Sequence, residues 1–167
     1  MTAVIDVAAA RARHDTHWET SMFAASHDPR PSGGGVGLAG AETVDDLLDE
    51  SRSRYERISV RAAYQWALHR RAVIVDIRPQ AQREAEGEVH PGLDPVVVER
   101  NDLEWRLDPR SDARLPWVTP ETRVIVLCQE GYASSLAAAS LARLGLRHVT
   151  DAVGGLRAWR EAGFPLA

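Results

Sequence analysis

The sequence predicts a single α/β domain in which a mainly parallel central sheet is flanked by helices in a three-layer arrangement. Two short runs of branched apolar residues, 72–77 and 124–127, have the composition of strands that are buried on both faces. Segments with the apolar spacing of helices alternate with these runs, which is typical of right-handed β-α-β units. The chain has 167 residues, a length that suits one domain of this kind.

Residues 1–42 are predicted to form a flexible arm, and residues 43–167 to form the folded domain. The arm contains several prolines and a run of glycines at 33–35, a composition that buries little apolar surface on folding. A phosphate-binding loop is disfavoured, because no strand-like segment precedes the glycines and the chain has no lysine. His14 and His17 are spaced as two metal ligands on one helix face, but no convincing third ligand lies nearby, so no metal site is predicted.

Two helix starts mark the beginning of the folded domain. Thr43 and Asp46 have the spacing of a capping box, which predicts a helix that runs to about Tyr55. Ser59 then has the position of an N-cap for a second helix over 60–70.

The later elements alternate between strands and a helix. Pro79 ends the first strand, and Cys128 directly follows a second buried strand. In parallel α/β sheets, ligands bind beyond the carboxyl ends of the strands, so Cys128 is expected at such a site. The predicted elements are strands at 72–77, 96–98, 124–127 and 148–153, and a helix at 135–144.

Composition excludes several classes of function. The absence of lysine removes Schiff-base chemistry and lysine-bound pyridoxal phosphate. The net charge is −4 and no stretch forms a basic stripe, so we do not expect nucleic acid as a partner. The sequence also lacks a long apolar run, so we do not expect a membrane as a partner. The single cysteine, Cys128, excludes an internal disulfide and a multi-cysteine metal centre, and a reducing, cytoplasmic location is expected.

The loop at 128–134 joins a buried strand to a helix, and its backbone N–H groups are therefore expected to turn inward as an anion-binding nest. A sulfur at the centre of such a nest is stabilised as the thiolate, because helix N-termini lower the pKa of cysteine from about 8.5. Gly131 gives the backbone the freedom that a tight loop requires. The alternative, a Cys128 side chain that is simply a small buried apolar group, is equally compatible with the spacing.

From about residue 55 to residue 167 the chain resembles the rhodanese-like sulfurtransferases. Each motif is weak by itself, but their order and spacing together are specific. The resemblance is carried by Val75-Asp76-Ile77-Arg78, Glu86-Gly87, Pro91-Gly92, the Cys128 loop, Gly154-Gly155-Leu156-Arg157-Ala158-Trp159 and Ala162-Gly163-Phe164-Pro165.

This resemblance implies that Cys128 accepts a sulfane sulfur as a persulfide and passes it to a thiol or to cyanide. The donor is then a small molecule such as thiosulfate or a persulfide, or a protein, and no cofactor is needed. Asp76 and Arg78 match a pair that is chiefly structural in the family. The implied substrate-binding loop consists of Gln129, Glu130, Gly131, Tyr132, Ala133 and Ser134.

The loop departs from the family pattern in its charges. Family members that act on thiosulfate often carry arginine at the positions that are Gln129 and Ala133 here, and Glu130 adds a carboxylate. An anionic donor is therefore expected to bind less well, by about 1 kcal/mol or more. A related phosphatase would need a loop one residue longer, with arginine at the position of Ser134, and this activity is rejected.

Two other functions remain as alternatives. The first is a non-catalytic module for partner binding or redox sensing, in which Cys128 is oxidised reversibly. The second is a hydrolase with a Cys–His pair, for which His90 and His148 are candidates although neither lies near Cys128 in the sequence. Trp105 and Trp117 are candidates for the walls of a site, with ordinary packing as the default interpretation.

Overall fold

The structure is a computed structural model that describes residue 41 and residues 43–167. The predicted arm lies outside the described residues, except for residue 41, and so do the candidate metal ligands His14 and His17. Among the described helices, none combines the length and the apolar character needed to cross a membrane.

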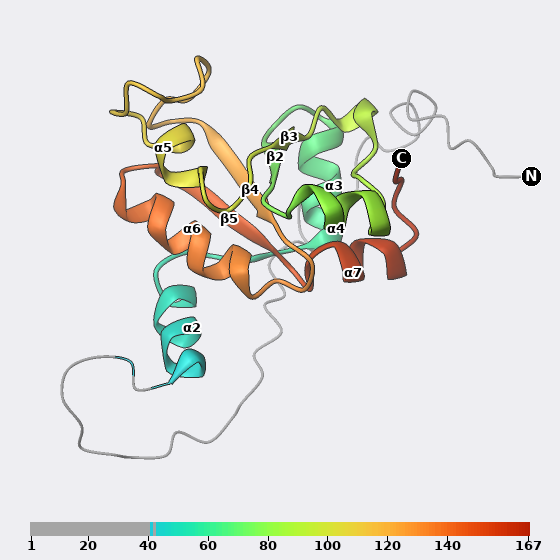
Figure 1. The fold of residues 1–167 in the computed structure, drawn as a ribbon, viewed down its shortest axis with the longest axis horizontal. Coiled ribbons are helices and arrows are strands. Elements are labelled where there is room, and N and C mark those ends of the chain that lie inside the picture. Colours follow the sequence, from blue (N-terminus) through green and yellow to red (C-terminus); the bar gives the residue numbers. More distant parts are fainter. Residues whose placement is uncertain (1–40, 42) are drawn as a thin grey trace, which may run out of the picture.

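In the described residues a five-stranded sheet has the order β1-β5-β4-β2-β3, and every paired neighbour is parallel (Figure 1). This confirms the predicted α/β fold with a parallel sheet. The strands are β1 (Ile58–Ser59), β2 (Val73–Asp76), β3 (Val96–Val97), β4 (Arg123–Leu127) and β5 (His148–Val153). The helices are α2 (Val44–Arg52), α3 (Val60–Leu68), α4 (Gln80–Glu86), α5 (Leu103–Leu107), α6 (Ala133–Arg143) and α7 (Gly155–Glu161), with a 3-10 turn at Pro91–Leu93.

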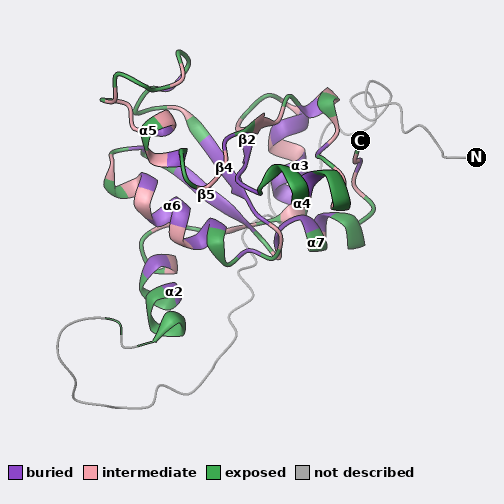
Figure 2. Cartoon of the chain, in the orientation of Figure 1, coloured by how far each residue is buried: buried purple, intermediate pink, exposed green. Residues whose placement is uncertain are grey.

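Strand β4 is buried after its first residue (Figure 2). Its apolar side chains alternate between two apolar clusters, one on each face of the sheet. Val124 and Val126 pack with residues of α5 and α6 on one face of the sheet. Ile125 and Leu127 pack with residues of α3 and α7 on the other face. The central strand therefore has no polar face, as its uninterrupted apolar sequence predicts.

Both predicted helix starts are confirmed. The Thr43 hydroxyl accepts a hydrogen bond from the Asp46 N–H (3.1 Å), and the Asp46 carboxylate accepts one from the Thr43 N–H (2.9 Å). The Ser59 hydroxyl caps α3 by accepting from the Ala62 N–H at 3.2 Å. Helix α2 ends at Arg52 and not at Tyr55 as predicted, and the Tyr55 hydroxyl instead reaches a buried carboxylate of β5.

Two short helices were not predicted. Helix α4 buries only Arg83, so no periodic apolar pattern reveals it in the sequence. Helix α5 has five residues, of which Leu103 and Leu107 are buried, and a segment of this length is too short for a helical period to be recognised. Both helices lie in the connections that link β2 through β3 to β4 (Figure 1).

Candidate functional site

Cys128 lies directly after the last residue of β4, and its loop leads into α6. The side chain is 6% exposed, and it belongs to the apolar cluster that contains Val126. The sequence order therefore places this thiol at the carboxyl end of the sheet, as expected for a ligand site of a parallel α/β fold.

Two backbone amides of the loop point at the sulfur. The N–H groups of Gly131 and Ser134 lie 3.2 and 3.3 Å from Cys128 Sγ. Gly131 adopts a positive φ of 82°, a conformation that glycine reaches without the steric cost of a side chain. The predicted nest is thus present, with these two amides as the described donors to the sulfur, and such donors stabilise negative charge on it.

A buried carboxylate lies beneath the loop and was not predicted. Asp151 of β5 is fully buried, and its Oδ2 accepts a hydrogen bond from the Ser134 hydroxyl at 3.0 Å. The same hydroxyl accepts one from Cys128 Sγ at 3.2 Å. A chain of hydrogen bonds therefore connects the thiol to a carboxylate in the core of the domain.

Arg57 compensates the charge of Asp151. Its Nε and Nη2 lie 2.7 and 2.9 Å from the two carboxylate oxygens, a bidentate geometry that is typical of strong Arg–carboxylate pairs. Burial lowers the pKa of Arg57, but the hydrogen bond and charge of Asp151 outweigh this effect and raise it overall. The Tyr55 hydroxyl also donates to Asp151 at 2.9 Å, and burial together with this carboxylate raises the pKa of Tyr55 well above its usual range. Tyr55, Arg57 and Asp151 therefore form one hydrogen-bonded network, in which the positive charge of Arg57 balances the negative charge of Asp151.

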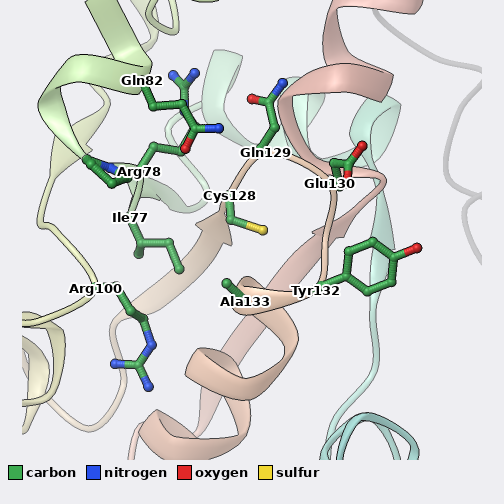
Figure 3. A pocket seen from close by; sticks show the side chains of 10 residues that line it. Ile77, Arg78, Gln82, Arg100, Cys128, Gln129, Glu130, Tyr132 and Ala133 are labelled. Atoms are coloured by element: carbon green, nitrogen blue, oxygen red, sulfur yellow. The ribbon is translucent and has the colours of Figure 1, made fainter. Parts of the chain in front are cut away.

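Beside Cys128 a cavity of about 260 Å³ opens between the loop and the segment that follows β2 (Figure 3). Arg100 contributes to its wall, and this residue was not predicted to belong to the site. Its Nη1 lies 2.7 Å from Glu104 Oε2. Burial raises the pKa of Glu104, but hydrogen bonds from Arg100 and Ser140 prevail and lower it. The lining residues are Ile77, Arg78, Pro79, Gln82, Arg100, Cys128, Gln129, Glu130, Tyr132 and Ala133.

Most of the predicted loop residues line this cavity, whereas Gly131 and Ser134 turn their amides to the sulfur. The Gln129 side-chain oxygen is buried and has no hydrogen-bond partner in the structure. The Glu130 carboxylate, which was expected to oppose an anionic donor, lies 2.6 Å from Arg157 Nη1 in an exposed ion pair. Tyr132 is 54% exposed at the mouth of the cavity.

Asp76 and Arg78 form a buried ion pair, and Arg78 also lines the cavity. Arg78 is 1% exposed, and its Nη2 lies 2.7 Å from Asp76 Oδ2 and 2.9 Å from the Gly87 carbonyl oxygen. Because its guanidinium binds both groups, Arg78 connects the end of β2 to the end of α4. The pair therefore joins two segments of the chain that border the cavity.

The candidate histidines lie elsewhere. His90 Nδ1 accepts a hydrogen bond from the Gly92 N–H (3.1 Å), and His148 Nε2 lies 3.4 Å from Glu121. Neither lines the cavity, and the same holds for Trp105 and Trp117. Among the residues that the structure describes, no group of His, Cys, Asp and Glu has the arrangement of a metal site. Among the described residues, no histidine therefore lines the cavity beside Cys128.

Comparison with solved structures identifies several similar proteins. A Rhodopseudomonas palustris protein of unknown function, described as a possible tyrosine phosphatase, is 32% identical with a TM-score of 0.66; the match covers 80% of this chain and all of the other. The polysulfide-sulfur transferase of Wolinella succinogenes is 21% identical (TM-score 0.58; 72% of this chain and 84% of the other). The human single-domain sulfurtransferase is also 21% identical (TM-score 0.52; 64% and 96%).

The family comparison covers the site itself. The rhodanese-like domain family matches residues 59–162, a span that begins at β1 and includes Cys128, its loop and α7. This match extends over more than half of the chain. The chain therefore belongs to the rhodanese-like domain family.

Proposed function

We propose that this protein is a sulfurtransferase in which Cys128 carries the transferred sulfur as a persulfide. The observation that supports this function is the position of the Cys128 sulfur. It borders a cavity and accepts hydrogen bonds from two backbone N–H groups. Such donors stabilise a thiolate, and then a persulfide anion, without the need for a metal or an organic cofactor.

The proposed reaction has two displacement steps. The Cys128 thiolate attacks the outer sulfur of a donor, the sulfur–sulfur bond of the donor breaks, and its remainder leaves with the electron pair as sulfite or a thiolate. An acceptor thiolate or cyanide then attacks the outer sulfur of the enzyme persulfide, and the Cys128 thiolate is released. Each step exchanges one bond to sulfur for another, so no external oxidant or reductant takes part.

Mass spectrometry of the intact protein tests this function. After incubation with thiosulfate, glutathione persulfide or inorganic polysulfide, we expect a gain of one sulfur atom on Cys128 that disappears when a thiol acceptor is added. If only glutathione or oxygen adducts form with every donor, the redox-sensing alternative replaces this proposal. An assay with p-nitrophenyl phosphate is expected to show no turnover, because the loop contains no arginine to bind phosphate oxygens.

Arg100 is expected to increase the affinity for anionic donors. Two arginines line the cavity, and the guanidinium of Arg78 is buried against Asp76, whereas Arg100 has a side chain that is 40% exposed. The variant Arg100→Gln is therefore predicted to raise KM for thiosulfate about threefold to tenfold with a smaller change in kcat, the size of effect given by about 1 kcal/mol of partly screened charge interaction.

The matched control for this prediction is Arg110→Gln. It removes the same charge from an exposed arginine that does not line the cavity. An equal rise of KM in both variants would mean that net charge alone matters, and an unchanged KM in Arg100→Gln would remove Arg100 from the donor site.

A further inference from the structure

The loop of Cys128 contains no arginine, but two arginines from outside the family match bind its backbone. Arg52 is the last residue of α2, and Arg57 immediately precedes β1. Both lie N-terminal to residue 59, where the match to the rhodanese-like family begins. The segment before the family domain therefore reaches the candidate active site.

Their shared target is the carbonyl oxygen of Gly131. Arg52 Nη2 and Arg57 Nη2 donate to this oxygen at 3.3 and 3.0 Å, and the Ser135 hydroxyl donates to it at 2.8 Å. The N–H of the same glycine donates to Cys128 Sγ. The Gly131 carbonyl thus accepts hydrogen bonds from the guanidinium groups, and the Gly131 N–H donates one to the sulfur.

Each arginine is fixed by further contacts. Arg57 makes the bidentate pair with Asp151, and its side chain is 19% exposed. Arg52 Nε donates to the Ser135 hydroxyl at 3.1 Å, and its guanidinium lies 5.8 Å from the centre of the Tyr132 ring. The helix that carries Arg52 packs against α6, and its Leu48 is buried. Both donors therefore have defined positions relative to the loop.

The backbone of Gly131 lies close to Gly154 and to Arg57. A β-carbon at this residue would lie 2.9 Å from the Gly154 nitrogen and 3.2 Å from Arg57 Nη2. The Gly131 carbonyl and N–H belong to the two peptide groups that meet at its Cα, so donors that hold the carbonyl also restrict where the N–H can point. If the guanidinium groups were removed, the carbonyl would have only the Ser135 hydroxyl as a donor, and that hydroxyl also lies 3.2 Å from Asp151 Oδ2.

We infer that Arg52 and Arg57 are positioning residues for the Cys128 nucleophile, acting through the Gly131 carbonyl. By fixing this carbonyl they keep the Gly131 N–H directed at the sulfur, where it stabilises the thiolate and the persulfide anion. The inference rests on the proposed function, because it assigns to these residues a role in the reactivity of Cys128. It also makes α2 a part of the functional domain.

Alkylation of Cys128 in the full-length protein tests this inference, with Arg52→Gln as the test variant and Arg54→Gln as the control. Arg54 lies two residues beyond α2, forms an exposed ion pair with Glu50 and has no described contact with the loop. At pH 7 we expect Arg52→Gln to lower the rate with iodoacetamide about threefold to tenfold, because loss of a charged donor weakens the fixation of the loop. The Arg54→Gln control should react within about twofold of the rate of the parent protein at the same pH.

Two further measurements separate positioning from other effects. The rates with iodoacetamide and with the anionic iodoacetate should fall by the same factor, and the melting temperatures of both variants should remain within about 4 °C of the parent protein. A loss confined to iodoacetate would show simple charge attraction and would overturn the inference, as would equal rates in Arg52→Gln and the parent protein. Alkylation does not require sulfur transfer, so a positive result here combined with a failed persulfide assay would reject only the proposed function.

Discussion

No sulfur transfer above the uncatalysed rate is expected from the Cys128→Ser variant. A serine hydroxyl cannot take up a sulfane sulfur as a persulfide, and no other cysteine exists in the chain to replace the missing nucleophile. Turnover is measured with thiosulfate and with glutathione persulfide, using a thiol acceptor in both cases. Sulfur labelling of the intact protein should also disappear with both donors.

The fold of this variant should persist, which makes the loss of activity interpretable. Serine is slightly smaller than cysteine, and its oxygen is placed to accept from the same two amides, those of Gly131 and Ser134. We therefore expect a change in stability of no more than about 1 kcal/mol, or a few degrees in melting temperature. Turnover equal to that of the parent protein, in a variant with an unchanged melting temperature, would show that Cys128 is not the nucleophile.

The sequence predicts those parts of the fold whose signals are local. The strand at 124–127 is an uninterrupted apolar run, and in the structure its side chains fill both clusters. Thr43 and Ser59 are polar caps placed directly before helical segments, and both caps form. Helix α4 has no such signal, because its exposed residues are polar and its buried one is an arginine that binds the Arg78 carbonyl oxygen.

In the candidate site, too, contacts within one loop follow from the sequence, whereas contacts between distant residues do not. Cys128 and the amides of Gly131 and Ser134 belong to one loop, so their meeting follows from the order of strand, loop and helix. Asp151 and Arg57 are 94 residues apart, and their pairing beneath the loop depends on β5 and β1 being neighbours in the sheet. A single sequence does not specify this neighbour relationship.

Charge at the loop was predicted incompletely for a similar reason. Glu130 was expected to oppose anionic donors, but its partner Arg157 lies 27 residues further along, at the start of α7. The local sequence also contains no sign that Arg100 borders the cavity. The net charge that a donor meets is therefore less negative than the loop sequence alone suggests.

The second large effect is expected from Gly155→Ala, which should destabilise the domain and displace the Cys128 loop. Gly155 has a φ of 58°, and a β-carbon there would lie 2.7 Å from both the carbonyl carbon and oxygen of Gln129 and closer still to the Cys128 carbonyl oxygen. These are backbone atoms, bound by the N–H groups of Arg157 and Leu156 at 3.0 and 2.9 Å. The added methyl group can therefore be accommodated only by separating α7 from the loop.

Helix α7 cannot retreat easily, because its other side is packed. Trp159 is fully buried, with its ring 5.8 Å from that of Tyr64 and 5.3 Å from that of Phe164. Steric strain at the positive φ and overpacking against the loop should together cost about 3 kcal/mol, or about 10 °C in melting temperature. Sulfur transfer should also fall, about tenfold or more, because the displaced loop no longer directs its amides at the sulfur.

Gly145→Ala is the matched control for this prediction. Gly145 also has a positive φ, 100°, but no heavy atom lies within 4 Å of the position that a β-carbon would take. Its substitution should cost only the backbone strain, about 1–2 kcal/mol, and should leave sulfur transfer unchanged. The difference between the two variants isolates the contact of α7 with the Cys128 loop. Equal melting temperatures and equal activities in the two variants would show that this contact neither stabilises the domain nor positions the nucleophile.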